Sequence, residues 1–145
     1  MSGGGSWWTP DLYSVRFSQN EQARKSGLWQ VFVTDFLQHY VRPTDWVLDL
    51  ACGHGEFINT IRCQRAIAID VNPDVGQYLL PDVEFHVSSA MTMVDVVSDC
   101  SVDVVFTSNL LEHLPDRGSL FAVAREVHRV LRPNGRWILL QPNIL

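Results

Sequence analysis

Two acidic residues and a glycine-containing turn are the features of this sequence best suited to binding a small polar ligand. Asp49 lies near the end of an apolar run, and the turn that follows contains Gly53 and Gly55, where the backbone can bend tightly and approach a ligand closely. Asp70 ends the next apolar run, fifteen residues after Gly55. Its carboxylate can accept two hydrogen bonds from the hydroxyls of a ribose. The pattern predicts a nucleoside site; the alternative is an Asp49 that only caps its own turn.

The residues around this turn argue against a pyrophosphate and in favour of a cation. Pyrophosphate-binding turns use a third glycine and the positive N-terminus of a helix. Here Ile58 stands at the third glycine position, and Glu56 in the first turn of the expected helix would repel a phosphate. A ligand with a positive sulfonium and no phosphate would instead be attracted. These features predict S-adenosylmethionine and disfavour the alternative, a NAD-dependent oxidoreductase.

Apolar runs of strand length must position these residues. Four runs are nearly continuous, as is typical of parallel strands buried on both faces, and a fifth alternates and is expected at the periphery of the sheet. The continuous runs are Trp46–Ala51, Ala66–Ile69, Val102–Phe106 and Arg136–Leu140, and the alternating run is Val83–Val87. Parallel sheets bind ligands at the carboxyl ends of their strands, where the glycine turn and Asp70 stand.

Helical patterns alternate with these runs. The expected helices are Asn20–Val41, Glu56–Arg62, Pro73–Leu80 and Arg117–Leu131. The apolar stripe of the first would contain Leu28, Val31, Phe32, Phe36 and Tyr40, widened by Trp29, Val33, Leu37 and Val41. That of the last would contain Leu120, Ala124, Val127 and Leu131. The alternation predicts an α/β fold, a Rossmann-like doubly wound and mostly parallel sheet of about five strands with helices on both faces, preceded by an N-terminal helix.

Four segments in this order resemble the class I S-adenosylmethionine-dependent methyltransferases of the type 11-like group. They read VLDLACGHGEF from Val47, AIAIDVNP from Ala66, SVDVVFTSNLLEHLPD from Ser101 and VHRVLRPNGRWILLQPN from Val127. The resemblance implies that the first segment binds the methionine end of the cofactor, Asp70 the ribose and Val71 the adenine. The implied residues of the first segment are Asp49, Ala51, Cys52, Gly53 and Gly55.

The resemblance also implies contacts farther along the chain. Ser89 and Ala90 follow the third strand, where the family often has an acidic residue for the adenine amino group, so a weaker or re-routed contact is expected. Asn109 and Leu110 would close over the cofactor. His113 would face the acceptor as a general base, or would only stabilise the start of a loop. Methyl transfer requires chiefly a well-placed nucleophile and sulfonium, so no fixed base is necessary.

Composition and charge limit the partners. The 145 residues are 46% hydrophobic and 19% charged, which predicts one packed domain, and the net charge of −5 opposes binding to nucleic acid or to an anionic membrane. The helically spaced Arg125, Arg129, Arg132 and Arg136 are expected to form a solvated face. Cys52, Cys63 and Cys100 form no C-x-x-C pair, which favours free thiols, a cytoplasmic location and no metal site. By elimination, a small-molecule methyl acceptor is expected.

The expected organisation is a tail followed by one domain. Residues 1–18 are predicted to be an N-terminal tail or lid, in which Trp7, Trp8, Tyr13, Arg16 and Phe17 could cover the cofactor, and residues 19–145 to be the S-adenosylmethionine-binding domain. Compared with the family fold, the domain would be truncated after its fifth strand, leaving an open edge for a homodimer. The sequence thus predicts a methyltransferase, with a non-catalytic or incomplete cofactor-binding domain as the alternative.

Overall fold

The computed structural model of the protein describes residues 19–142, and their side chains from residue 23 onward. The aromatic residues of the predicted N-terminal tail or lid, Trp7 to Phe17, lie outside the described residues. The division into residues 1–18 and 19–145 therefore stays a prediction.

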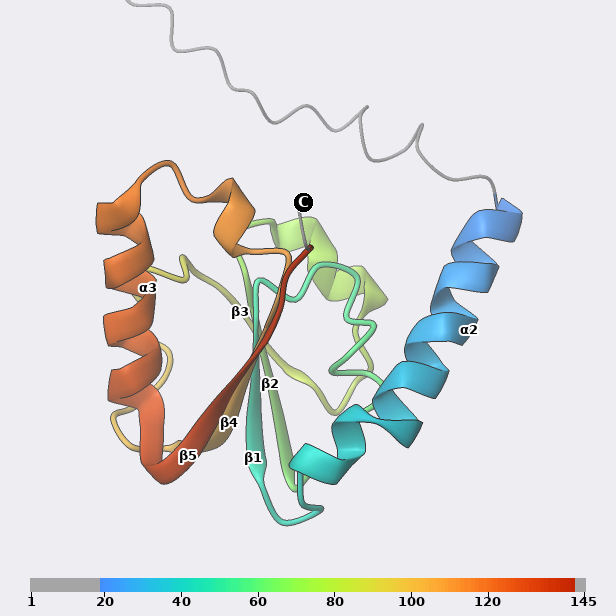
Figure 1. Ribbon diagram of the computed structural model, residues 1–145, viewed down its shortest axis with the longest axis horizontal. Helices are drawn as coiled ribbons and strands as arrows, with labels where there is room; N and C mark the ends of the chain where they lie inside the picture. Colours follow the sequence, from blue (N-terminus) through green and yellow to red (C-terminus); the bar gives the residue numbers. More distant parts are fainter. Residues whose placement is uncertain (1–18, 143–145) are drawn as a thin grey trace, which may run out of the picture.

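A five-stranded sheet forms the centre of the fold (Figure 1). Its order is β3-β2-β1-β4-β5, and all four pairings are parallel. The strands are β1 (Trp46–Leu50), β2 (Arg65–Asp70), β3 (Glu84–Val87), β4 (Val102–Ser108) and β5 (Leu131–Leu140). The chain runs outward from β1 to β3 and then returns to place β4 on the other side of β1. The carboxyl ends of β1 and β4 therefore form the switch point at which open α/β sheets bind ligands.

Helices cover both faces of this sheet, which confirms the predicted fold class. On one face, α2 (Gln19–Asp35) and the 3-10 turn η1 (Leu37–Tyr40) pack against a core that includes Val47, Ala68 and Phe106. On the other face, α3 (Arg117–Val130) packs with Leu48 and other strand residues that point the opposite way. Figure 1 shows α2 and α3 on opposite sides of the sheet. Central strands buried on both faces explain why their sequences are continuously apolar.

The first predicted helix is shorter than expected and buries the flank of its predicted stripe. The α-helix ends at Asp35, and the chain continues as η1. Thr34 Oγ1 donates to the carbonyl of Gln30 at 2.9 Å, a back-bond of the kind that bends helices. Of the five central residues of the stripe only Phe32 is partly buried, whereas Val33, Leu37 and Val41, which were expected to widen it, are buried and Trp29 is partly buried. The members that are exposed instead are Leu28, Val31, Phe36 and Tyr40.

The two short predicted helices are not α-helical. Residues 56–60 form successive turns, in which only isolated helical hydrogen bonds occur, such as Asn59 N to Gly55 O at 2.9 Å. Pro73–Tyr78 is the 3-10 helix η2, capped by the side chain of Asn72. A helix of one or two turns returns too few hydrogen bonds for its nucleation cost. Contacts between the two segments determine their conformation instead. Asn59 Nδ2, for example, donates to the carbonyl of Tyr78 at 2.8 Å.

The last predicted helix is confirmed in extent, and its predicted core stripe is confirmed in part, since Val127 is buried and Leu131 packs against the core. Its buried residues are Val123, Val127 and Val130, whereas Leu120 is exposed. The expectation of a solvated arginine face is wrong for two members: Arg129 pairs with Glu126 and Asp99, and Arg132 pairs with Asp103 and lies over the ring of Trp46. Arg136 also donates to the carbonyl of Tyr40. These arginines join separate parts of the fold.

Two glycines provide a matched test of this packing. A Cβ at Gly135 would lie 2.8 Å from the carbonyl oxygen of Arg132 and 3.1 Å from that of Asp103, whereas a Cβ at Gly27 in α2 would meet nothing within 4 Å. We expect Gly135→Ala to lower the free energy of unfolding by about 1 to 3 kcal/mol through overpacking. Gly27→Ala should raise it by roughly 0.5 to 1 kcal/mol, because alanine orders a helix at lower entropic cost. Urea unfolding of both variants checks this, and equal effects would contradict it.

Candidate functional site

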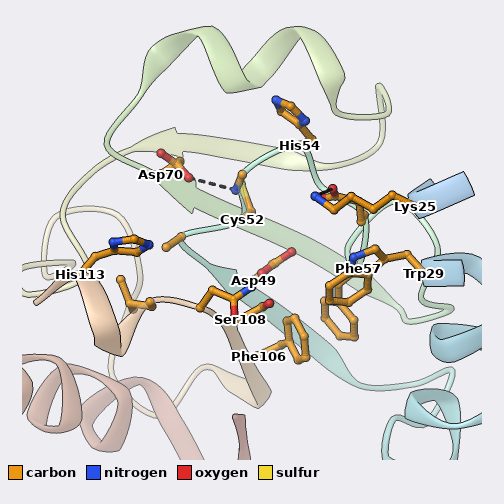
Figure 2. A pocket seen from close by; sticks show the side chains of 15 residues that line it. Lys25, Trp29, Asp49, Cys52, His54, Phe57, Asp70, Phe106, Ser108 and His113 are labelled. Carbon is orange, nitrogen blue, oxygen red and sulfur yellow. Dashed lines mark hydrogen bonds and ion pairs between the residues drawn. The ribbon is translucent and has the colours of Figure 1, made fainter. Parts of the chain in front are cut away.

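A pocket of about 260 Å³ opens at the carboxyl ends of β1, β2 and β4 (Figure 2). It lies at the switch point of the sheet, where a ligand site is expected. Its lining residues come from α2, the turn after β1, the end of β2, and the end of β4 with the loop that follows; they are Lys25, Trp29, Asp49, Ala51, Cys52, Gly53, His54, Glu56, Phe57, Asp70, Phe106, Ser108, Asn109, Leu110 and His113.

The turn after β1 is left-handed at three alternate positions. The φ angles are 61° at Ala51, 52° at Gly53 and 73° at Gly55. Glycine adopts this region freely, whereas a Cβ makes it costly by roughly 1 kcal/mol or more, so Ala51 is a strained residue in the pocket wall. Gly55 has a second constraint, since a Cβ there would collide with the side chains of Leu79 and Asn59. Gly55 therefore shapes the turn and does not itself line the pocket.

Asp70 connects the end of β2 to this turn. Its Oδ2 accepts a hydrogen bond from the amide of Gly53 at 3.0 Å, and its Oδ1 accepts one from the amide of Asn72 at 2.9 Å. A carboxylate has about four acceptor positions, so two amides leave room for ligand hydroxyls. The geometry holds the carboxylate in one orientation at the pocket wall.

Asp49 is a buried carboxyl group at the pocket, and its side chain lies among the other pocket residues in Figure 2. The residue is 3% exposed. Burial raises its pKa well above the usual range, the negative charges of Glu56 and Asp70 raise it further, and a hydrogen bond from the amide of Ile58 partly offsets these effects. The charged groups that act on Asp49 are thus both acidic. A ligand cation beside it would relieve this repulsion and lower the pKa.

Cys52 is an unreactive thiol in this setting. Burial raises its pKa, and the charges of Asp49 and Asp70 add to that shift. Because the thiolate is the nucleophilic form, the protonated Cys52 contributes shape to the pocket and no covalent chemistry.

Glu56 is paired, which corrects one step of the sequence argument. Lys25 on α2 places its Nζ 3.0 Å from Glu56 Oε1. The lysine partly compensates the charge that was expected to repel a phosphate. The negative character of the pocket therefore depends chiefly on Asp49 and Asp70.

Aromatic rings form a wall of the pocket. Phe57 and Phe106 stack with centroids 3.9 Å apart, and Trp29 lies edge-on to Phe106 at 6.4 Å. The ring centroid of His54, in the glycine turn, lies 4.4 Å from the ring centroid of Tyr78. Among the lining residues, the sequence did not point to Lys25, Trp29, Phe57, Phe106 and Ser108 as part of a site. Phe106 ends a predicted strand run and Ser108 follows it closely, so their position was available as a signal, but no local pattern relates α2 to the glycine turn.

The loop after β4 places three further predicted residues at the pocket. Asn109 is left-handed, with φ of 52°, and its amide donates to the carbonyl of Leu140 at 2.9 Å. Leu110 follows it in the pocket wall. The side chain of His113 is 63% exposed, and its Nε2 lies 3.7 Å from Glu112 Oε1. His113 is thus accessible to an acceptor from solvent, and its role as a base stays a prediction.

The predicted residues for the adenine stand apart from the pocket lining. Val71 is 70% exposed, directly after Asp70, and offers an apolar surface beside the carboxylate. Ser89 and Ala90 lie in the segment that follows β3. None of the three lines the pocket, so their contacts with adenine stay predictions.

The comparison with known families agrees with this site. The family described as a methyltransferase domain matches residues 48–139, more than half of the 145-residue chain. The chain belongs to this family. The match spans the sheet from β1 to β5 and includes every pocket residue except the two contributed by α2.

Named relatives and solved structures are similar over most of the domain. A demethylmenaquinone methyltransferase of Symbiobacterium thermophilum is 24% identical, over 90% of this chain and 56% of its own. A 27-O-demethylrifamycin SV methyltransferase of Amycolatopsis mediterranei is 31% identical, over 68% of this chain and 39% of its own. The structure of a Haemonchus contortus phosphoethanolamine N-methyltransferase, with phosphoethanolamine and S-adenosylhomocysteine, shares the fold with a TM-score of 0.69 at 19% identity, over 89% of this chain and 30% of its own. The chain spans about two fifths to just over half of the length of these two curated relatives.

The described residues contain neither a metal-binding cluster nor a helix that could span a membrane. Within residues 19–142, no group of three or more His, Cys, Asp or Glu side chains is arranged to hold a metal ion. No helix in the same part of the chain has the length and apolar character needed to cross a bilayer.

The buried carboxyl group provides a test of the pocket's electrostatics. The folded-state pKa of Asp49 is raised, so its contribution to stability falls as pH rises from the unfolded pKa towards the folded one. We expect Asp49→Asn, which is neutral, to raise the free energy of unfolding at pH 7 by about 1 kcal/mol or more, since one pKa unit corresponds to about 1.4 kcal/mol.

Urea unfolding from pH 4 to 8 measures this difference. The gain of the variant over the wild type should shrink towards acid pH, where Asp49 becomes protonated. A gain that is constant with pH, or a loss of stability at pH 7, would contradict a raised pKa.

Proposed function

We propose that the domain binds S-adenosylmethionine in this pocket and transfers its methyl group to a small-molecule acceptor. The observation that carries the proposal is Asp49, a carboxyl group buried at the pocket near the end of the central strand, whose pKa is raised by burial and by the negative charges of Glu56 and Asp70. A buried carboxylate in such surroundings favours a cationic partner. S-adenosylmethionine carries a positive sulfonium and a positive ammonium, and a phosphate-bearing cofactor does not match this charge.

The residues present fit the parts of this cofactor. Asp49 suits the ammonium, and Lys25 is a cation at the same pocket that suits the carboxylate of the methionine end. Asp70, fixed by two backbone amides, suits the ribose hydroxyls. The exposed apolar surface of Val71 suits one face of the adenine. Ser89 and Ala90, in the segment after β3, are the further residues proposed for its contact. Asn109 and Leu110 would close the pocket on the side of β4.

The bound cofactor supplies the methyl group and a neutral leaving group, and the protein supplies position. The aromatic wall of Phe57, Phe106 and Trp29 limits the motion of a ligand and excludes water from one side. His113 can accept a proton from an acceptor hydroxyl or ammonium that enters from solvent. A small-molecule acceptor is supported by the names of the menaquinone and rifamycin relatives and by the net charge of −5. A non-catalytic cofactor-binding domain is the alternative, which turnover with an acceptor library would exclude.

Calorimetric titration tests the cofactor. We expect micromolar binding of S-adenosylhomocysteine and no measurable binding of NAD. Asp70→Ala should weaken S-adenosylhomocysteine at least tenfold, because hydrogen bonds to a charged group are worth about 1.5 to 3 kcal/mol. Asp74→Ala is the matched control, since it removes an equal charge from an exposed residue of η2 outside the pocket lining. Equal losses in both variants, or tighter binding of NAD, would overturn the proposal.

We also propose that a second copy of the chain pairs with the exposed edge of β5. Among the described strands β5 has β4 as its one neighbour, and its Leu139 is 44% exposed. Such an edge is a template for another strand, and a charge upon it opposes pairing. Light scattering should give a dimer that Leu139→Lys weakens, and a monomer at high concentration would contradict the pairing. The cytoplasmic location also stays a prediction.

A further inference from the structure

Helix α2 has a second apolar surface on the side that faces away from the sheet. Leu28 and Val31 are 67% and 58% exposed, whereas Val33 is fully buried. Successive residues of an α-helix are about 100° apart, so Leu28 and Val31 lie within about 60° of each other and about 140° to 160° around the helix from Val33. Among the helices and strands of Figure 1, α2 is the outermost element on its side of the sheet. A second helix therefore has access to this surface.

Two charged residues extend this surface into a strip. Arg24 precedes Leu28 by four positions, Asp35 follows Val31 by four, and both are exposed. Spacings of four, three and four residues are those of the contact seam between two packed helices. We call these four residues the outer strip. Its centre is apolar, and its two ends have opposite charge.

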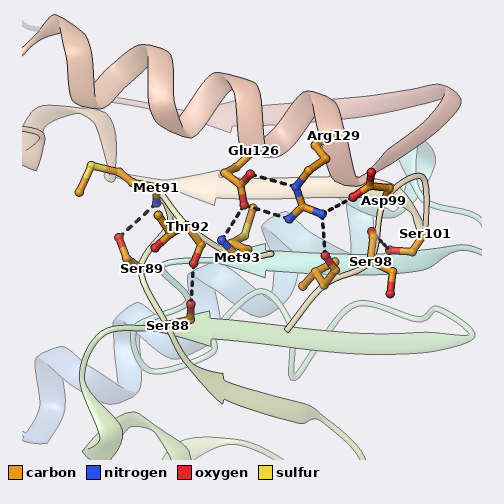
Figure 3. Close-up of polar contacts among 11 residues, drawn as sticks. Ser88, Ser89, Met91, Thr92, Met93, Ser98, Asp99, Ser101, Glu126 and Arg129 are labelled. Atoms are coloured by element: carbon orange, nitrogen blue, oxygen red, sulfur yellow. Dashed lines mark hydrogen bonds and ion pairs between the residues drawn. The ribbon is translucent and has the colours of Figure 1, made fainter. Parts of the chain in front are cut away.

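The two charges of the outer strip cannot pair with each other. Arg24 and Asp35 stand eleven residues apart, which is about 16 Å along the helix axis, whereas an ion pair requires about 4 Å or less. On α3 the situation is different, since Figure 3 shows Arg129 between Glu126 and Asp99 of the same chain. Within the outer strip, opposite charges can meet only across a second helix.

The outer strip is complementary to itself in one orientation. Its two apolar residues and its two charges have the same midpoint. When a second copy of α2 lies antiparallel about that midpoint, Leu28 packs on the partner's Val31, and Arg24 meets the partner's Asp35. Each contact occurs twice, because a two-fold interface repeats it. A parallel arrangement would bring Arg24 beside the partner's Arg24 and is opposed by like charge.

We propose that the outer strip of α2 pairs antiparallel with the outer strip of a second copy of the chain, forming a two-fold dimer. The inference goes beyond the proposed function and does not depend on a cofactor. Trp29, which lines the pocket, lies about 100° to 160° around the helix from Leu28 and Val31, so the pairing leaves the pocket open. One helix face is small compared with the roughly 1,200 to 2,000 Å² buried in stable complexes. We therefore expect a dissociation constant on the order of 100 μM.

Exchange of the two charges tests this register. Arg24→Asp makes both ends of the strip acidic, and Asp35→Arg makes both ends basic. Each variant alone should associate at least about fivefold more weakly, because two ion pairs are replaced by repulsion at once. An equimolar mixture of the two variants should recover the association, since every end of one strip then meets an opposite charge on the other. The double variant Arg24→Asp/Asp35→Arg should recover it as well.

Sedimentation equilibrium at low ionic strength, up to about 500 μM protein, measures the association. All variants also carry Leu139→Lys, whose charge opposes pairing at the edge of β5. In this background Leu28→Asp should abolish the dimer. Phe121→Asp is the matched control, because Phe121 is an apolar residue of α3 that is 62% exposed and it should leave the association unchanged. Urea unfolding of each variant verifies that the fold is kept.

Four results would overturn the inference. The first is a Leu139→Lys chain that stays monomeric at about 500 μM. The second is a mixture of the charge variants that associates no better than either alone, since the antiparallel register is then wrong. The third is an equal effect of Phe121→Asp and Leu28→Asp, which would place the interface elsewhere. The fourth is a Leu28→Asp variant that lowers the free energy of unfolding of a monomeric chain, because the chain's own residues then cover the strip.

Discussion

The site depends on a charge buried at the end of the central strand. β1 lies between β2 and β4, both of its faces are covered, and Asp49 is placed where almost no water reaches it. Burying a carboxylate without a cation costs free energy, which is visible as its raised pKa. The fold tolerates this cost because the adjoining strands bury enough apolar surface. A cation beside Asp49 would offset this cost.

The elements around Asp49 provide the other parts of the pocket wall. The glycine turn brings backbone close to the pocket, and Asp70 fixes that turn from the neighbouring strand. Helix α2 crosses from one face to the rim and contributes Lys25 and Trp29. Because Lys25 pairs with Glu56, the unpaired negative character of the pocket is concentrated at Asp49 and Asp70.

Ion pairs in this protein join elements that are distant in sequence. Arg129 connects α3 to the segment before β4, and Arg132 connects the start of β5 to Asp103 of β4. Exposed pairs contribute little to stability, but those of Arg129 are largely shielded and satisfy backbone groups that would otherwise lack partners. Their effect is to order the irregular chain before β4. The irregular segments thereby gain a position that their own backbone could not define.

Local patterns determined the strands, the glycine turn, Asp49 and Asp70, and the resemblance carried by four segments determined the family. These features are encoded within short stretches of sequence. An apolar run indicates a buried strand, and a tight turn requires its glycines whatever the rest of the fold. Only the tertiary structure decided which side of α2 is buried, that residues 56–60 form turns, and that Lys25 and Trp29 line the pocket. Leu28 and Val33 are both apolar, and periodicity cannot choose between them, because the choice depends on the sheet that the helix meets. Contacts such as Met93 to Glu126 join residues 33 positions apart and leave no periodic signal in the sequence.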